Sequence, residues 1–367
     1  MPQLNQSIMT SNRHSWQASS PPAQSSPAIS VILPVFNAAA YVQEAVTSIL
    51  EQTFGAFELI LIDDGSSDET LAILNGFARS NARIRLIRQE NAGVVAALNR
   101  GLSLARGRYV ARMDADDRAY PERFTAQFEF LEAHPEVAVL GSSVRFIDCA
   151  GTTFGEWRVP ATHRDIKAGL LGGDCPLPHP SVMARREVLV AAGGYCDRFA
   201  HAEDFELWLR LSRAHGFANL PQPLLDYRIH PQGVSVTRLR EQLLATERAL
   251  RERRGDLPED IASTAAFRRH FSDQAFLRAE LLMRAGCGDE ARALYETIST
   301  ELNHPWHRVA VDWASAGYLK AFNPRRRWRN LALSLAMAGL IRPGLLLEQL
   351  RIKLDFLVRG LNLPTFL

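Results

Sequence analysis

Three carboxylates follow an apolar run that is typical of a buried β-strand, in the stretch from Tyr109 to Asp117. Asp114 and Asp116 are two positions apart, so on an extended chain both side chains leave the same face and can reach one cation. Like charges grouped at the end of a buried strand are unfavourable unless a cation balances them. A divalent metal site is therefore one interpretation of the stretch, and a solvated acidic turn is the other.

The elements that must position these carboxylates alternate between strand and helix. β-branched and apolar runs predict strands, and helical spacing of apolar residues predicts helices between them. This alternation predicts an α/β fold with a mostly parallel sheet covered by helices on both faces. Pro34 is expected to end the first strand, and residues 141–180, rich in Gly and Pro, are expected to be irregular. The expected strands are 29–33, 57–62, 84–87, 109–113 and 137–140, and the expected helices are 41–52, 71–77, 93–105 and 121–131.

Polar residues occur where each of the first four strands ends. Asn37 follows the first strand, Asp64 the second, Asn91 the third and Asp114 the fourth. Ligands of open α/β sheets bind beyond the carboxyl ends of the strands. We therefore expect these residues to share one ligand cleft.

The composition excludes several classes of protein. A net charge of +2 on 367 residues argues against a nucleic-acid partner, and four widely spaced cysteines suggest neither a zinc site nor a disulfide framework. Neither a signal-peptide pattern nor a run of about 18 apolar residues is present. The expected location is cytoplasmic.

Five motifs together resemble family 2 inverting glycosyltransferases of the GT-A fold, over residues 28–235. They match that family in order and spacing, so the assignment does not depend on any one of them. The motifs are SVILPVFN (30–37), SILEQTF (48–54), LIDDGSSDET (61–70), NAG (91–93) and MDADD (113–117).

The resemblance implies how the donor nucleotide sugar is bound. Pro34 and Phe36 would line the base pocket, and Asp64 would hydrogen-bond the base or the ribose. Phe36 occupies a position where relatives often have Tyr. Phenylalanine keeps the ring that can stack on the base but lacks the hydroxyl of tyrosine. Asp114 and Asp116 would form the Asp-x-Asp motif of the family, and Arg228 would lie near the diphosphate. Asn37 is also expected to contact the nucleotide sugar.

The acceptor side is expected at two later segments. Family members carry a Glu-Asp pair at the position of Glu203 and Asp204, which implies that Asp204 is the catalytic base and Glu203 an acceptor contact. The alternative is that both carboxylates only complement the dipole at a helix start. His179 is either an acceptor contact or a packed structural histidine.

A metal ligand is expected in the segment that follows the predicted catalytic base in the sequence. Residues 227–230, YRIH, are similar to a Tyr-Arg-x-His segment of the family whose histidine can ligate the metal. Asp116 and His230 would then hold Mn²⁺ or Mg²⁺, and the imidazole favours Mn²⁺.

Three regions are expected along the chain: a disordered leader (1–27), a GT-A domain (28–237) and a helical C-terminal region (238–367). Residues 319–367 carry nine Lys and Arg against two acidic residues. This charge, with a basic Trp-bearing segment at 325–329, is typical of a helix lying on the inner face of a membrane. A helical cap with a solvated basic face is the alternative.

The expected activity is metal-dependent inverting transfer of a sugar, from a UDP-sugar or another nucleotide sugar, to a saccharide or lipid-linked hydroxyl in cell-surface polysaccharide assembly. A sugar nucleotidyltransferase would show a Gly-rich phosphate loop with a basic residue after the first strand, which PVFN (34–37) lacks. An inactive nucleotide-binding module with a partner-recruiting tail is the alternative outside catalysis.

Overall fold

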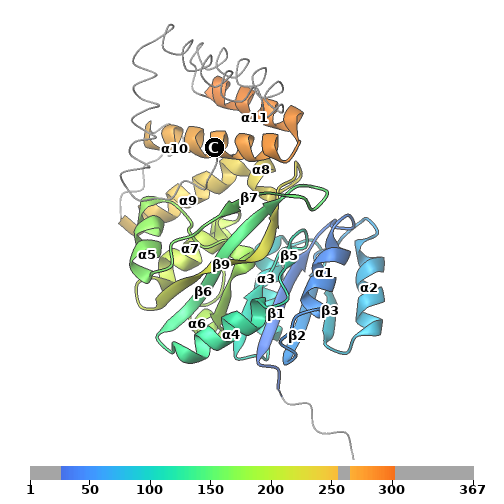
Figure 1. Ribbon diagram of the computed structural model, residues 1–367. Helices are drawn as coiled ribbons and strands as arrows, with labels where there is room; N and C mark the ends of the chain where they lie inside the picture. The colour runs from blue at the N-terminus through green and yellow to red at the C-terminus, as the bar shows by residue number, and fades with distance from the viewer. Residues whose placement is uncertain (1–25, 255–264, 302–367) are drawn as a thin grey trace, which may run out of the picture.

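The computed structural model describes residues 26–254 and 265–301 (Figure 1). The expected leader up to residue 25 and the basic segment after residue 301 lie outside the described residues. The described chain forms one nine-stranded sheet with helices around it, in the order β3-β2-β1-β4-β8-β6-β9-β5, and β7 pairs with β6.

The first half of the sheet is parallel. Strands β3, β2, β1 and β4 are neighbours in that order and run in the same direction. Alternate residues of β1 enter different cores: Val31 and Leu33 pack in the cluster that contains Val46 of α1, whereas Ile32 packs with Leu98 of α3. This period of two places helices on both faces, as predicted. The elements are β1 (Ile29–Val35), α1 (Val42–Leu50), β2 (Phe57–Asp63), α2 (Thr70–Ser80), β3 (Ile84–Arg88), α3 (Val94–Leu104) and β4 (Tyr109–Arg112).

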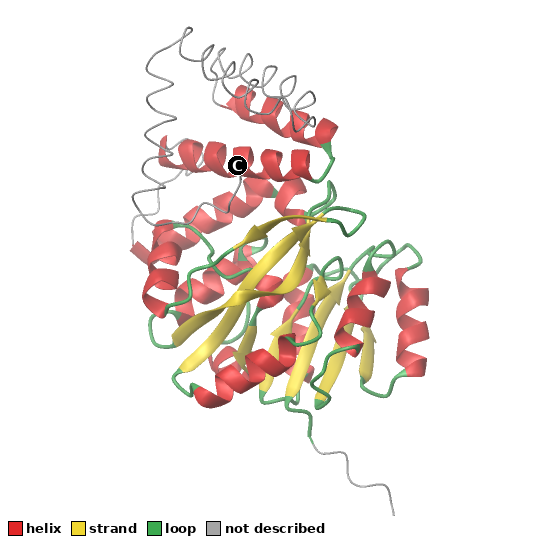
Figure 2. Ribbon diagram, viewed as in Figure 1, coloured by secondary structure: helices red, strands yellow, loops and turns green. Residues whose placement is uncertain are grey.

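The second half of the sheet is mixed. Strand β6 is antiparallel to β7 and β8 but parallel to β9, and β9 pairs antiparallel with the short β5 (Figure 2). The connecting helices include α7, which carries the predicted base. The elements are β5 (Arg118–Ala119), α4 (Arg123–Ala133), β6 (Val137–Ile147), β7 (Thr153–Trp157), α5 (His163–Gly172), β8 (Met183–Arg185), α6 (Arg186–Ala191), α7 (Glu203–Leu211) and β9 (Gly216–Arg228), with 3₁₀ turns at His179–Ser181 and Asp197–Phe199.

Two expectations about local structure were wrong. Strand β1 does not end at Pro34 but continues to Val35, and Pro34 aligns with Ile62 of β2. Residues 141–180 are not irregular, because they contain the end of β6, all of β7 and α5. The C-terminal cap of α5 explains the glycines there, since Gly173 adopts a left-handed conformation with φ of 99°.

Helices cover the far end of the mixed half. The hairpin of α10 (Ala265–Arg284) and α11 (Gly288–Glu301) places Ala279, Leu282 and Ala291 in one apolar cluster with Phe146 of β6 and Ile229. The short α8 (Val234–Thr237) and then α9 (Leu239–Arg254) lead to this hairpin. Within residues 26–254 and 265–301, no helix combines the length and apolarity needed to cross a membrane.

Candidate active site

The loop after β4 gathers three carboxylates. One carboxylate oxygen comes from each of Asp114, Asp116 and Asp117, and the three oxygens lie within 4.8 Å of one another. Among the described residues, this is the one group of three Asp, Glu, His or Cys side chains whose atoms lie close enough to hold a metal ion together. Asp117 is buried, and its Oδ2 has no hydrogen-bond partner. Burial, with the charges of Asp116 and Asp114, raises the pKa of Asp117 well above its ordinary value.

This donor set fits a divalent cation. Oxygen ligands lie about 2.0–2.6 Å from Mg²⁺ or Ca²⁺, so oxygens within 4.8 Å of one another can share one such ion. The buried Oδ2 of Asp117 has no hydrogen-bond partner, and a cation bound there would satisfy this oxygen and favour the ionised form of the carboxyl.

His230 adjoins the cluster through Asp116. Its Nε2 lies 2.8 Å from Oδ2 of Asp116, and its Nδ1 lies 3.2 Å from the amide oxygen of Gln232. Burial lowers the pKa of His230, but the hydrogen bond and charge of Asp116 outweigh burial, so the pKa is raised overall. The two predicted metal ligands are therefore in contact, although they are 114 residues apart.

Arg112 links the acidic loop to the rest of the cleft. Its guanidinium makes a bidentate pair with Asp114, at 2.6 and 2.5 Å, and its side chain is 8% exposed. Burial raises the pKa of Asp114 to about 6, with smaller contributions from the charges of Asp116 and Asp204, while Arg112 opposes the rise. Asp204 therefore lies close enough to Asp114 for its charge to raise the pKa of that carboxyl.

The predicted base lies in the first turn of helix α7. Oδ1 of Asp204 accepts a 2.7 Å hydrogen bond from the Phe205 amide, and Oδ2 lies 3.9 Å from the Cys175 thiol. Burial raises the pKa of Asp204. Burial, and then the charge of Asp204, raises the pKa of Glu203 to about 7, and Oε2 of this buried residue has no hydrogen-bond partner.

His179 lies beside the base within the protein. Its Nε2 is 3.0 Å from the Tyr195 hydroxyl, and its ring packs edge-on against Trp208. Burial lowers its pKa well below the ordinary value, so the imidazole is neutral and its 3.9 Å approach to Asp204 is not an ion pair.

The predicted nucleotide side lies beyond β1 and β2. Phe36 is 51% exposed, as a stacking platform requires. Asn37, with a left-handed φ of 48°, accepts a hydrogen bond from the Ser67 amide and thereby joins the two strand-end loops. Asp64 is buried and accepts hydrogen bonds from Gln89 and from two backbone amides, beside an open hollow lined by Gly65 and residues 88–91.

Arg228 contacts protein groups on all sides. Its Nε donates to the carbonyl of Asp116 at 2.7 Å, and its Nη2 pairs with Glu44 at 2.5 Å. The side chain is 1% exposed. The structure thus shows this residue held by protein groups next to the acidic loop, and its expected place near the diphosphate stays a prediction.

Comparison with known proteins agrees with the motifs. The model of the family described as "Glycosyl transferase family 2" matches residues 30–191. An uncharacterized glycosyltransferase of Haemophilus influenzae is 33% identical over 236 residues, which are 62% of this chain and 73% of that protein. The chain belongs to glycosyltransferase family 2.

Two further matches to this family 2 glycosyltransferase are informative. The amylovoran biosynthesis glycosyltransferase AmsE of Erwinia amylovora is 35% identical over 188 residues, 51% of this chain and 70% of that protein. The mannosyltransferase PcManGT of Pyrobaculum calidifontis, solved with GDP-Man and Mn²⁺, is 18% identical with a TM-score of 0.50, and the match covers 83% of this chain and 88% of that one. The predicted GT-A fold is confirmed.

Sequence reasoning missed several residues of the site in this family 2 glycosyltransferase. Asp117 completes the acidic cluster, and its place in a run of three carboxylates was the available signal. Arg112 falls within the predicted strand 109–113, although a cation two positions before Asp114 can pair with it. Glu44 had no local signal, because its partners Arg118 and Arg228 are distant in the sequence.

Proposed function

We propose that this family 2 glycosyltransferase transfers a sugar from a nucleoside diphosphate donor to a hydroxyl, with a divalent metal and with inversion at the anomeric carbon. One observation carries the proposal: Asp204, a carboxylate with a raised pKa, lies close enough to the cluster of Asp114, Asp116 and Asp117 for its charge to raise the pKa of Asp114. Residues that can hold a metal to neutralise a diphosphate and a carboxylate that can deprotonate an alcohol are thus close together.

In the proposed mechanism, the acidic loop and His230 would hold Mn²⁺ or Mg²⁺. When bound, the metal neutralises charge that develops on the leaving phosphate. Asp204 removes the proton from the acceptor hydroxyl as that oxygen attacks. The Phe205 amide holds Oδ1, which leaves Oδ2 to accept the proton.

One displacement with one base inverts the anomeric centre, so a second carboxylate nucleophile is not required. The raised pKa of Asp204 makes the carboxylate a stronger base than an exposed aspartate. His179, neutral and hydrogen-bonded to Tyr195, forms the wall behind the base.

The donor in this proposal is a UDP-sugar, and the acceptor is a saccharide or lipid-linked hydroxyl. The likeness to AmsE, which is named for amylovoran biosynthesis, supports a role in assembling a cell-surface polysaccharide. A lipid-linked acceptor would place the enzyme on the inner face of the membrane, where the basic segment 319–367 would meet anionic lipid.

The test is a screen of UDP-sugars and GDP-sugars for Mn²⁺-dependent release of nucleoside diphosphate with a mixture of candidate acceptors. Asp204→Asn keeps the size of the side chain and should lower kcat by about 10²–10⁴-fold, the usual contribution of a general base. Asp116→Ala should abolish the Mn²⁺ dependence together with the activity.

Glu206→Gln is the matched control for Asp204→Asn. Glu206 lies in the same first turn of α7 and pairs with Arg210, so its loss removes a helix-dipole partner without touching the cleft. Equal loss of activity in both variants would favour the dipole interpretation and contradict a catalytic role for Asp204.

A further inference from the structure

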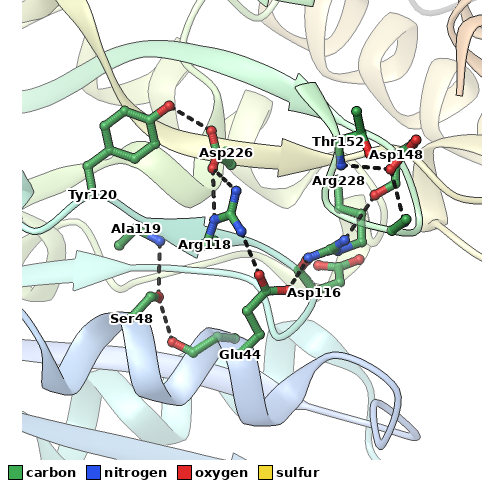
Figure 3. Close-up of polar contacts among 12 residues, drawn as sticks. Glu44, Ser48, Asp116, Arg118, Ala119, Tyr120, Asp148, Thr152, Asp226 and Arg228 are labelled. Carbon is green, nitrogen blue, oxygen red and sulfur yellow. Dashed lines mark hydrogen bonds and ion pairs between the residues drawn. The ribbon is translucent and has the colours of Figure 1, made fainter. Parts of the chain in front are cut away.

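Glu44 of helix α1 bridges two arginines that come from different parts of the chain. Its Oε1 lies 2.7 Å from Nη1 of Arg118, and its Oε2 lies 2.5 Å from Nη2 of Arg228 (Figure 3). Arg118 begins β5, and Arg228 ends β9. One carboxylate therefore bridges the ends of two adjacent antiparallel strands.

Each arginine is attached to one half of the predicted metal site. Arg118 directly follows Asp117, and Asp226 anchors it through two hydrogen bonds of 2.9 and 2.6 Å. Arg228 stands two residues before His230, and Figure 3 shows it next to Asp116. Glu44 thus connects the segment that carries the three aspartates to the segment that carries the histidine.

Arg228 also holds the loop directly. Its backbone amide donates to Oδ1 of Asp117 at 2.9 Å, and its Nε donates to the carbonyl of Asp116 at 2.7 Å. Its Nη1 donates to the carbonyls of Asp148 and Cys149. A rotation of this guanidinium would therefore release the backbone of Asp116, one of the three carboxylates of the loop.

Glu44 balances the charge of this buried guanidinium. In the part of the chain that the structure describes, Arg228 forms its ion pair with Glu44. The nearby carboxylate of Asp226 is paired with Arg118 instead. Without Glu44, the guanidinium of Arg228, 1% exposed, would keep only neutral partners, which are backbone carbonyls and the ring of Tyr41. The side chain of Glu44 is itself 41% exposed, so its removal should leave the core of the fold intact.

We propose that Glu44 is a positioning residue that fixes the acidic loop relative to His230 and so sets the affinity of the site for a divalent metal. This inference rests on the proposed metal-dependent function. Residues that support metal ligands from behind typically change metal affinity by about 10–100-fold when they are lost.

The test compares wild type, Glu44→Gln and Glu51→Gln. Glu51 is an exposed carboxylate at the end of the same helix and lines the same surface hollow as Glu44 and Arg118, so it controls for lost surface charge. Binding of Mn²⁺ alone is followed by the EPR signal of the free ion. Hydrogen–deuterium exchange of peptides spanning residues 114–119 and 226–230 is measured without metal.

We expect Glu44→Gln to bind Mn²⁺ about tenfold more weakly and to exchange faster in both peptides, while Glu51→Gln matches wild type. Unchanged affinity and unchanged exchange in Glu44→Gln would overturn the inference. A lower urea midpoint with unchanged Mn²⁺ affinity would also overturn it, because the contact would then serve stability alone.

The two proposals fail in different ways. If wild type binds no Mn²⁺, the metal in the proposed function is refuted, and the exchange data still decide whether Glu44 fixes the loop. If wild type binds Mn²⁺ and Glu44→Gln binds it equally well, only the role of Glu44 is refuted.

Discussion

Replacing Glu203 by glutamine should stabilise the protein at alkaline pH and leave its stability at acidic pH unchanged. Glu203 is 7% exposed, and one of its carboxylate oxygens has no hydrogen-bond partner. Burial and the charge of Asp204 raise its pKa from 4.5 to about 7. An ionised Glu203 is therefore unfavourable in the folded protein, whereas a neutral amide of similar shape is not.

The magnitude follows from linkage between folding and protonation. Between pH 4.5 and pH 7 the folded state holds a proton on Glu203 that the unfolded state has released, so stability falls as the pH rises. The pKa difference, 7 − 4.5 = 2.5, corresponds to about 3 kcal/mol at about 1.4 kcal/mol for each unit of pKa. Glu203→Gln should recover up to this amount above pH 7 and almost none below pH 4.5.

Urea unfolding at pH 4.5 and pH 8, in EDTA, measures the free energy of unfolding for wild type and variant. The exposed Glu51→Gln serves as the control for loss of a carboxylate on the surface. The reasoning is refuted if Glu203→Gln changes the free energy of unfolding equally at both pH values, or destabilises the protein at pH 8.

Three other outcomes are expected. Asp64→Asn should lower the free energy of unfolding by about 1–3 kcal/mol without any nucleotide, because an amide nitrogen cannot accept the hydrogen bonds of Gly93 or Ala92; unchanged thermal unfolding would contradict this. Gly65→Ala should cost at least about 1 kcal/mol in the same assay, since φ is +78° and the new Cβ would lie 2.9 Å from a backbone nitrogen; a neutral effect would show that the turn can relax. Since Asp204 must be ionised to accept a proton and burial raises its pKa, kcat/KM should fall as the pH decreases through a value above 3.8, and an inflexion below that value would contradict its role as the base.

The parallel half of the sheet could be predicted from the sequence because strands and helices there follow one another locally. The strand β9 could not be, because Pro221 and Pro223 lie within it and prolines argue against a central strand. The structure accommodates them at an irregularity, where the register between β6 and β9 shifts between Ser142 and Ser143. Because of these two prolines, the sequence pattern does not predict the strand that ends at Arg228, two residues before His230.

The site was predictable where neighbouring residues or motifs supplied the signal. Asp114 and Asp116 were expected to reach one cation from their spacing alone, and they lie in one cluster. The orientation of Asp64 and Arg228 could not be anticipated, since it depends on partners 25 to 184 residues away in the chain. Their contacts within the protein are visible only after the chain has folded.

The apolar contact between the α10–α11 hairpin and Phe146 determines which fragments of the chain can keep their packing after truncation. Ile229, which separates Arg228 from His230, shares that contact. A fragment that stopped at residue 237, where the motifs of the family run out, would expose both apolar side chains to water immediately beside a proposed metal ligand. Helices α10 and α11 therefore pack in one unit with the segment that carries His230, and we expect a fragment that ends at residue 237 to be less stable than the longer chain.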